Sequence, residues 1–532
     1  MKLDYKKIVY IGLIFFIISL FWQTYDMLIA RTLIDKFGLN QTWSGIIMAL
    51  DNIMAVFLLP IFGALSDKSN SKFGRRTPYI IVGTVLAAFA FMALSFADHQ
   101  QSLKLQSTDI VTEHYSVAFN DIDDINESLH WQSIVDNMRN ERLESYQEGR
   151  ISGIDYDNWN EAINIRMQNI LDANLNRLTT RELSMIRDLY FNYLSSRAWE
   201  VTADDPIIFF IFGSILFVSL VAMAIFRSPA VALMPDVTIK PLRSKANAVI
   251  NLMGAAGGII AVNTIMFSGL NKNTYDSHTA IYIIIGVLML ITLGIFLWKV
   301  REPKLVNEKR EEDVKYNLSN GQDEKAISAN QMSIQKRLSL YFLLASVFLW
   351  FAGYNAVMSK IADYLPKVLN MEFFELPFII AQGVVVLTIL PVGFFSMKLG
   401  RKRSVMLGII ILASAMSTVF FLGESSKWMV AGVIAFAGIG WTSISINSYP
   451  MVVELSQGAN VGKYTGYYYS ASMAAQIFTP IFSGILMDRF TRIVLFPYAA
   501  VFVLLSFVTM LFVKHGDAKK IPQSLLDALE TD

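Results

Sequence analysis

The chain has 532 residues, of which 54% are hydrophobic, and a mean hydropathy of +0.44. A positive mean hydropathy combined with long uncharged apolar runs is typical of an integral membrane protein and excludes a soluble globule. The formal net charge is +1, and the sequence has no cysteine, which excludes disulfides, thiolate chemistry and cysteine-bound metal.

Twelve apolar runs are long enough to cross a bilayer, because a helical span needs ~20 mostly apolar residues. In chain order, the predicted spans are 8–30, 42–65, 77–97, 206–234, 246–268, 279–300, 338–358, 376–397, 403–422, 427–449, 463–486 and 493–513. The predicted fold class is therefore an all-α polytopic membrane protein with twelve transmembrane helices.

The short loop between the second and third spans fixes the predicted orientation. It carries Asp67, Lys68, Lys72, Arg75 and Arg76. Short loops rich in lysine and arginine stay on the cytoplasmic side. The loops after the fourth, sixth and eighth spans are also basic, so we predict that both termini are cytoplasmic and that 98–204 is extracellular.

The two halves of the chain show a weak internal repeat. Tyr25 and Tyr354 follow a tryptophan in the first and seventh spans, offset by 329 positions, whereas Asp236 and Glu454 are offset by 218. The offset drops by about the length of 98–204, which indicates an insertion into the first of two six-helix pseudo-repeats. The predicted units are 1–97, the insert 98–204, 205–300, a cytoplasmic linker 301–336, 337–515 and a cytoplasmic tail 516–532.

The insert has the composition of a small acidic helical domain. It holds 19 acidic and 9 basic side chains and several helical stripes, and Thr179 with Glu182 predicts a capping box. Its aspartate-rich runs, at 121–127 and 155–161, lack the glycine and the glutamate of a calcium loop. We therefore predict a solvated face and no metal site.

Three ionisable side chains lie inside predicted spans, where an unpaired charge is costly. Asp51 and Asp26 are candidates for binding a coupling cation or proton. The alternatives are a structural hydrogen bond between Asp51 and Asn52, and an interfacial position for Asp26. Arg227 is expected to meet Asp67 or Glu454 as a gate latch, or to form a static pair with one of them.

Polar and aromatic side chains within the spans suit a sugar, whose hydroxyls need amides and whose ring faces need flat aromatics. The substrate-binding candidates are Trp22, Tyr25, Asn247, Asn251, Trp350, Tyr354, Asn355, Gln382, Asn447 and Gln476. The aromatic members also fit the interfacial belts of membrane proteins.

The stretch Gly63–Pro78, GALSDKSNSKFGRRTP, resembles the signature between helices 2 and 3 of the major facilitator superfamily. Together with LMPDVTIKPLRSKAN (233–247) and INSYPMVVE (446–454), it is similar to the glycoside and sucrose–cation symporter branch. The resemblance implies proton-coupled uptake of a sugar or glycoside by alternating access in the cell membrane. It also implies a gate that comprises Gly63, Asp67, Gly74, Arg75 and Arg76, joined by Arg227 and Glu454.

Two departures from the family pattern qualify this resemblance. Met397 stands where the second copy of the signature should have an acidic residue, and Asp51 is the only aspartate within the second span, where melibiose-type sodium symporters carry two. The alternative functions are an exporter or facilitator of another small solute, and a receptor-like membrane protein that uses 98–204. We expect a monomer in the lipid bilayer that binds a small-molecule substrate and a coupling proton or sodium ion, and no enzyme activity, cofactor or nucleic acid.

Overall fold

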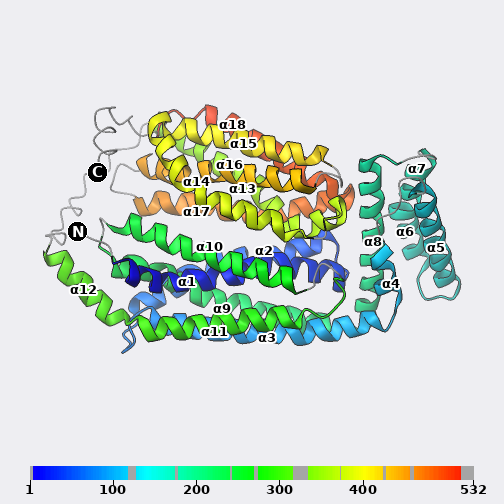
Figure 1. Ribbon diagram of the computed structural model, residues 1–532, viewed down its shortest axis with the longest axis horizontal. Helices are drawn as coiled ribbons and strands as arrows, with labels where there is room; N and C mark the ends of the chain where they lie inside the picture. The colour runs from blue at the N-terminus through cyan, green and yellow to red at the C-terminus, as the bar shows by residue number, and fades with distance from the viewer. Residues whose placement is uncertain are drawn as a thin grey trace.

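The computed structural model describes residues 4–117, 127–173, 178–239, 242–268, 273–315, 334–371, 373–422, 427–455 and 461–516 (Figure 1). Every regular element within these ranges is helical, and none of them is a strand. Each of the twelve predicted spans falls on one long helix, although several helices extend further than predicted.

Six of the long helices come from the first part of the chain. They are α1 (Tyr5–Thr24), which continues through the π-helical turns η1 (Tyr25–Ile29) and η2 (Thr32–Lys36), α2 (Gln41–Lys68), α3 (Thr77–Gln106), α9 (Ile207–Val237), α10 (Arg243–Phe267) and α11 (Thr279–Lys299). In this group α1 packs on α10, and α3 packs on both α9 and α11.

Six further helices come from the second part of the chain. They are α13 (Ile334–Leu369), α14 (Glu375–Leu399), α15 (Arg401–Phe421), α16 (Lys427–Leu455), α17 (Val461–Arg489), followed by the 3₁₀ turn η6 (Arg492–Val494), and α18 (Leu495–Leu511). The two groups meet where α2 packs on α17 and α10 on α14. Among the described residues, eleven helices are long and apolar enough to cross a membrane, and α14 has a shorter apolar stretch, Glu375–Ile389.

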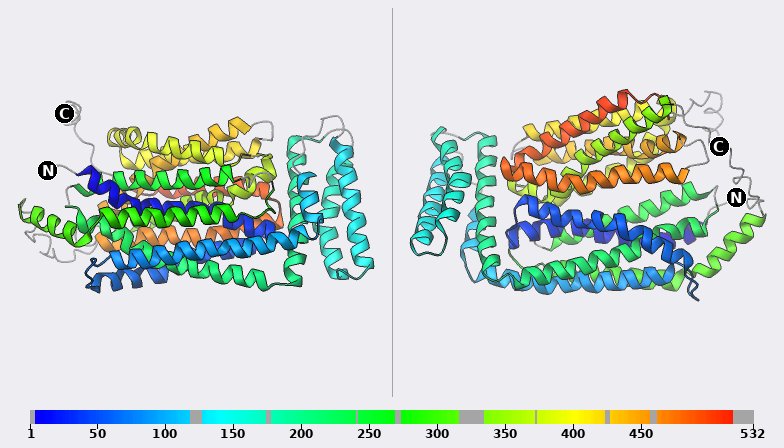
Figure 2. Two further views of the ribbon diagram at one scale, coloured as in Figure 1. Left: turned by 60° about the horizontal axis from the view of Figure 1, so that its bottom comes forward. Right: turned by 180° about the vertical axis from the view of Figure 1, so that it is seen from behind.

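A separate group of helices lies beyond one end of this bundle, and we call it the cap (Figures 1 and 2). It consists of α4 (Ile110–Val117), α5 (Glu127–Gln147), α6 (Gly153–Trp159), the π turn η3 (Asn160–Asn164), α7 (Ile165–Ala173) and α8 (Thr180–Asp204). The cap has its own hydrophobic core, which includes Trp131, Tyr190 and Leu194. The predicted capping box of Thr179 and Glu182 is present at the start of α8.

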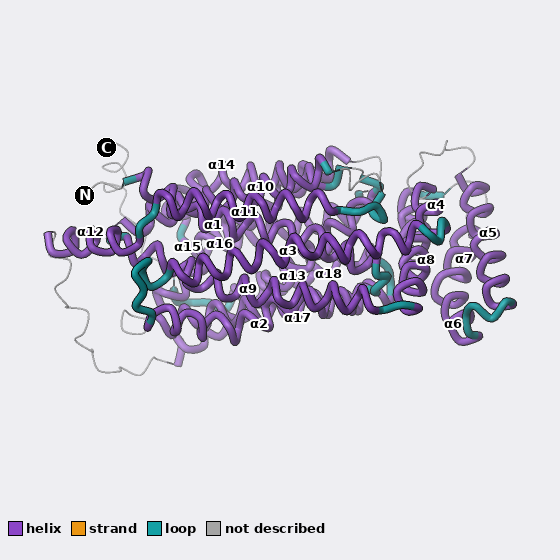
Figure 3. The backbone as a smooth tube through the Cα atoms, turned by 90° about the horizontal axis from the view of Figure 1, so that it is seen from below, coloured by secondary structure: helices purple, strands orange, loops and turns teal. Residues whose placement is uncertain are grey.

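We call the bundle end beside the cap the cap end, and the other the linker end. α12 (Glu302–Lys315) extends from the linker end, where α1 begins and α18 finishes (Figures 1 and 3). The aspartate-rich run at 155–161 forms α6 and the start of η3, whereas the run at 121–127 lies almost wholly outside the described residues. Among the described residues, no cluster of acidic or histidine side chains is suited to hold a metal ion.

Two helices reach well past their predicted ends toward the cap. The third predicted span ends at 97, but α3 continues to Gln106; the seventh ends at 358, but α13 continues to Leu369. Some of the charged side chains in these extensions, such as Asp98 and Lys367, are buried in ion pairs instead of facing water. α3 and α13 therefore extend past the predicted spans because charged residues in their last turns form ion pairs with other parts of the chain.

The cap is seated on the bundle by a backbone contact at Gly38. Gly38 has a φ of +70°, in the left-handed region that favours glycine. A Cβ added there would lie 2.1 Å from the backbone nitrogen of Trp199 and 2.4 Å from the carbonyl oxygen of Ser195, both on α8. α8, which runs crosswise to the bundle (Figure 2), therefore packs on this turn with no space for a side chain.

We expect Gly38→Ala to loosen the cap from the bundle, because the methyl group would collide with the α8 backbone. The matched control is Gly149→Ala, which has a φ of +71° but no atom within 4 Å of the added Cβ. Both variants acquire the same strain of about 1–2 kcal/mol for a non-glycine residue in this region. Only Gly38→Ala should also accelerate protease cleavage of the cap helices, and equal cleavage rates would contradict the contact.

Candidate functional site

The two aspartates predicted to bind a cation lie close together within the bundle. Asp26 is on the π turn η1, and Asp51 is on α2, near enough for the two negative charges to interact. Both side chains are partly exposed, and Asp51 Oδ1 accepts a hydrogen bond of 2.7 Å from Asn52 Nδ2. π-helical turns are uncommon and often occur at functional sites. The proposed structural bond between Asp51 and Asn52 is thus present.

Arg227 lies near this pair of aspartates, and the sequence analysis did not predict that position. Its guanidinium lies 5.7 Å from the centre of the Trp22 ring and interacts electrostatically with Asp51 and with Tyr469 on α17. In this structure Asp67 pairs with Arg76 and Glu454 with Arg401, and the latch between Arg227 and either carboxylate stays a prediction. α9 continues ten residues past Arg227, or ~15 Å at 1.5 Å per residue, so this side chain lies inside the bundle rather than at its linker end.

The aromatic candidates of α1 lie beside the charged cluster. The rings of Trp22 and Tyr25 pack edge to face with centroids 5.4 Å apart. The indole Nε1 of Trp22 and the hydroxyl of Tyr25 are buried and have no hydrogen-bond partner within the protein. Two donors of this kind are costly unless another group satisfies them, so this corner of the site suits a ligand with oxygen acceptors.

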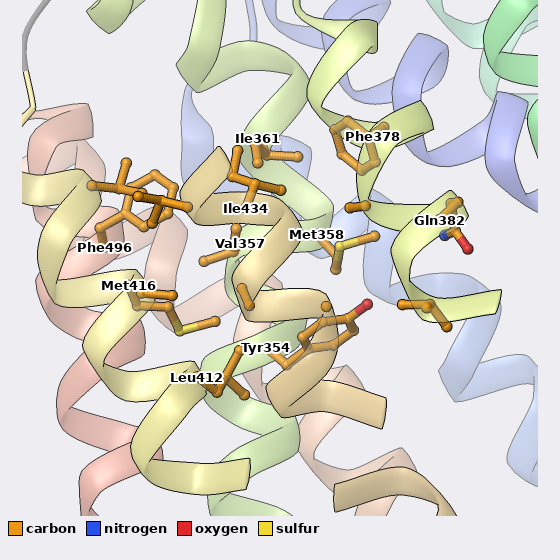
Figure 4. A pocket seen from close by; sticks show the side chains of 17 residues that line it. Tyr354, Val357, Met358, Ile361, Phe378, Gln382, Leu412, Met416, Ile434 and Phe496 are labelled. Carbon is orange, nitrogen blue, oxygen red and sulfur yellow. The ribbon is translucent and has the colours of Figure 1, made fainter. Parts of the chain in front are cut away.

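The candidates on α13 and α14 differ in their surroundings. Tyr354 stacks on Trp441 with centroids 3.7 Å apart, Asn355 Nδ2 is buried without a partner, and Trp350 is fully buried in the core. Tyr354 and Gln382 line a cavity of about 60 Å³ within the second group of helices (Figure 4). This cavity has room for a water molecule or two but not for a sugar ring.

The remaining substrate-binding candidates either form hydrogen bonds within one helix group or are exposed. Asn447 Nδ2 donates to Ser396 Oγ and to the Ser443 carbonyl, both at 2.8 Å. Gln476 Nε2 donates to a carbonyl one turn earlier on α17, at 3.3 Å. Asn247 and Asn251 are exposed near the start of α10.

The predicted gate loop at the linker end is held together by acceptors from three helices. Arg76 pairs with Asp67 on α2 and, at 2.9 Å, with Asp236 on α9, and Arg75 lies 3.6 Å from Asp236. Glu302 of α12 accepts hydrogen bonds from the backbone nitrogens of Arg75 and Arg76 at 2.8–3.0 Å.

Both glycines of the signature are close to other parts of the chain. A Cβ at Gly63 would lie 2.9 Å from Ser228 Oγ on α9, and a Cβ at Gly74, whose φ is +108°, would lie 2.3 Å from the Glu302 carboxylate. The ion pairs described for this loop therefore hold the first helix group together, and none of them reaches the second group. Glu454 pairs instead with Arg401 of the second group, at 3.4 Å.

The cap end contains a buried network of charges that the sequence analysis missed. Asp35 of η2 pairs with Lys367 of α13, which also lies 2.6 Å from Asp363. Asp363 Oδ2 accepts from Arg492 Nε and from Gln41 Nε2, both at 2.7 Å. All five side chains are at most 3% exposed. The only sequence signal was the pairing of opposite charges four residues apart just beyond an apolar run, as in Asp363 and Lys367.

The cap joins this network through α8. Asp188 accepts from Arg492 Nη1 at 2.6 Å, and Asn192 Oδ1 accepts from the same nitrogen at 2.6 Å. Arg181 of α8 also lies 4.7 Å from the ring centre of Phe420 on α15. The network therefore ties three parts of the chain together: the first helix group, the second helix group and the cap.

A second buried pair lies in the first group at the same end. Lys36 Nζ lies 2.6 Å from Asp98 Oδ1, and Asp98 Oδ2 accepts from the backbone nitrogen of His278. Burial and the neighbouring Lys36 charge lower the pKa of His278 to about 4, so its ring is neutral at physiological pH.

The start of α2 is capped by a carboxylate from the other helix group. Asn40 Oδ1 accepts from the backbone nitrogen of Trp43 at 2.8 Å, and Asp488 of α17 accepts from the backbone nitrogens of Gln41 and Thr42, also at 2.8 Å. A negative charge at a helix N-terminus is stabilising. The first turn of α2 is thereby fixed to the end of α17.

The two ends of the bundle therefore differ. At the cap end a Cβ at Gly45 on α2 would lie 2.1 Å from the Pro480 carbonyl on α17, so the two backbones touch. Toward the linker end, Tyr469 on α17 is 53% exposed although it interacts with Arg227, and Asn251 on α10 is exposed. The two helix groups are therefore in direct backbone contact at the cap end.

Charged groups that meet between two groups of long apolar helices are typical of a polytopic membrane transporter. Residues 198–388 and 379–527 match the Major Facilitator Superfamily, and residues 10–108 match the MFS/sugar transport proteins. These matches cover more than half of the chain, which therefore belongs to the Major Facilitator Superfamily and is a transporter rather than an enzyme.

Individual relatives resemble the chain over short segments. It is 30% identical over 64 residues to the sucrose transport protein SUC4 of Arabidopsis thaliana, a match covering 12% of each chain. It is 33% identical over 60 residues to the general alpha-glucoside permease of Schizosaccharomyces pombe, covering 11% of each. The matched segments thus span about a tenth of these curated relatives.

Solved structures are similar over nearly the whole chain. The xylose transporter XylE from E. coli has a TM-score of 0.56 at 13% identity over 98% of both chains. The nucleoside transporter NupG has a TM-score of 0.54 at 11% identity, over 95% of this chain and 100% of its own. At such identities the likeness shows the fold.

We expect Asp363→Asn to destabilise the protein strongly, because it leaves Lys367 and Arg492 without their shared carboxylate. Breaking a buried pair typically costs about 3–5 kcal/mol. The control is Asp136→Asn, which removes an exposed pair with Arg139 at 3.3 Å and should cost less than about 1 kcal/mol. Thermal unfolding in detergent compares them, and similar midpoints for the two variants would show that the network contributes little.

Proposed function

We propose that the protein is a secondary active transporter that takes up a sugar or glycoside together with a proton. Asp26 and Asp51 are the coupling groups, and Arg227, Trp22 and Tyr25 complete the site. The observation that carries this proposal is the meeting of both aspartates with Arg227 in a partly exposed cluster between membrane helices. Ionisable residues within the membrane are usually functional.

The architecture that accompanies this function is twelve transmembrane helices in two six-helix pseudo-repeats, with 98–204 as an inserted extracellular domain. The basic loops at the linker end support a cytoplasmic position for that end and for both termini in the plasma membrane. The arrangement of α1 to α3 with α9 to α11, and of α13 to α18, as two packed groups agrees with this division.

Charge balance supports coupling to a cation. The cluster contains two carboxylates and one guanidinium, so one negative charge is uncompensated when both aspartates are ionised. An uncompensated charge in a low-dielectric environment favours uptake of a proton or a cation. Binding of the proton would neutralise the site and allow the helix groups to close around the substrate.

Sugar recognition is supported by the unsatisfied donors beside this cluster. Trp22 Nε1, Tyr25 Oη and Asn355 Nδ2 are buried without partners, and sugar hydroxyl oxygens are acceptors for such groups. The matches to MFS/sugar transport proteins, SUC4 and the alpha-glucoside permease point to the same substrate class.

Alternating access is supported by the asymmetry of the bundle. Contacts between the helix groups are tight at the cap end, whereas the linker end leaves Tyr469 and Asn251 exposed. This is the arrangement expected of one of two states in which the site opens to opposite sides. The gate loop with Gly63, Asp67, Gly74, Arg75 and Arg76 would keep the first group rigid while the groups rock.

We expect proteoliposomes that contain a pH-sensitive dye to acidify when a transported mono- or disaccharide is added outside. Asp51→Asn should abolish this acidification, because it removes the charge that takes up the proton. The matched control, Asp157→Asn, changes an exposed residue of α6 and should transport normally.

Other outcomes of this measurement assign the coupling differently. Acidification that persists in Asp51→Asn and is lost in Asp26→Asn would place coupling at Asp26. Absence of any response across the sugar panel, with or without a sodium gradient, would leave the fold intact and refute the sugar assignment.

We expect Asp35→Asn to shift the protein away from the state that is closed at the cap end, because it removes the negative charge that pairs with Lys367 of the other helix group. A single cysteine introduced as Tyr469→Cys can report this shift, because the chain has no cysteine of its own. Its labelling by an impermeant thiol reagent from the linker side should slow several-fold when Asp35→Asn is added. Labelling of a Val314→Cys reporter on exposed α12 should not change. An unchanged rate at position 469 would argue against the buried pair as a gate.

A further inference from the structure

A groove of about 1060 Å³ lies between the cap and the bundle, and we call it the cap groove. The cap lines one side with residues of η3, α7 and α8, and the bundle lines the other with the starts of α2 and α9 and the end of α17. The volume is at the upper end of the range of small-molecule sites. The transport site described above does not include it.

The walls of the groove combine flat aromatic faces with hydrogen-bonding groups. Trp43 is 60% exposed, Trp199 46% and Phe490 56%, although all three line a concave surface. Asn192 and Ser195 of α8 lie along the same surface. Exposed indoles beside amides and hydroxyls suit a ring that is apolar on its faces and polar at its edge.

The groove also contains an unsatisfied acceptor. Gln41 is 3% exposed, and its Nε2 donates to Asp363, but its Oε1 is buried and has no hydrogen-bond partner. A buried carbonyl oxygen without a donor is costly. Because Oε1 is buried, the Gln41 side chain would have to turn toward the groove to accept a hydrogen bond from a ligand rich in hydroxyl groups, and a hydrocarbon chain would offer no donor.

The groove borders the network that closes the cap end. Gln41 and Arg492 both line it, and both bind Asp363. Arg492 also binds Asp188 of α8, so one residue touches the groove, the cap and the second helix group. A ligand in the groove would therefore contact side chains that must move before the cap end can open.

We infer that the cap groove is a second binding site for the transported glycoside, which docks there from outside before the cap end opens. This inference rests on the proposed function for the identity of the ligand. The chemical class is a sugar with at least one further ring, such as a disaccharide or an aryl glycoside, because the groove is larger than one pyranose and has aromatic surfaces on both sides. The insert thus contributes half of a capture site for the substrate.

Cysteine protection measures this binding independently of transport. Ala162→Cys places a thiol on the exposed cap side of the groove, and the rest of the full-length protein has no cysteine. With the protein in lipid nanodiscs, a panel of disaccharides and p-nitrophenyl glycosides should slow its reaction with a maleimide. We expect Trp199→Ala, and separately Trp43→Ala, to raise the half-protecting concentration at least tenfold. Trp428→Ala, an exposed tryptophan outside the groove, should leave it unchanged.

The outcomes separate this inference from the proposed function. Protection that is retained in Asp51→Asn, while coupled uptake is lost, is the expected result. Protection by a glycoside in a protein that transports no sugar would refute the proposed function and keep the groove as a sugar site. Absence of protection at concentrations that saturate uptake would overturn the groove proposal alone. Protection by a short-chain phospholipid but by no sugar would also overturn it.

Discussion

The structure depends on charges that are buried at the cap end and must be paired there. Asp35 and Lys367 are 332 positions apart, and each is at most 2% exposed. Unpaired, such charges would each cost several kcal/mol, so the first helix group cannot leave the second at this end without rehydrating both side chains. The same requirement holds for Arg492, which binds Asp363 of the second group and Asp188 of the cap. Buried charge pairing therefore helps to set the relative positions of the three parts of the chain.

This arrangement gives the two ends of the bundle different energetics. The described ion pairs at the linker end, such as Arg76 with Asp236 and Arg401 with Glu454, stay within one helix group. They stiffen each group and need not break when the groups separate. At the cap end the pair of Asp35 with Lys367 crosses between the groups, so opening there exchanges a buried pair for two hydrated charges. Under the proposed alternating access, ligand binding would have to supply the free energy that opens the cap end, because a ligand shifts such an equilibrium only by its differential affinity.

The sequence predicted what depends on composition and local periodicity. All twelve apolar runs form helices, and the capping box of α8 is present, because helices in lipid must satisfy their own backbone and caps are local. It did not predict where α3 and α13 end, since those polar turns are stable only beside partners distant in the sequence. The interaction of Arg227 with Asp51 was not predicted for a related reason. The depth of a residue along one helix does not determine which neighbouring helix its long side chain can reach. Asp26 and Asp51 were predicted as ionisable groups within the spans, but the sequence did not show that their charges lie near enough to interact.

The proximity of Asp26 to Asp51 bears on which cation this site could bind. A lone aspartate in the second span is a poor site for a metal cation, which needs several oxygen ligands, yet the π turn at Tyr25–Ile29 brings Asp26 from the first span to Asp51. A proton needs only one carboxylate to bind it, and a second negative charge nearby favours its uptake, whereas sodium would require further oxygens at defined positions. Asn52 already donates its amide to Asp51, and Arg227 adds positive charge beside it, which disfavours a second cation. The composition of the cluster therefore agrees better with the proposed coupling to a proton than with coupling to sodium.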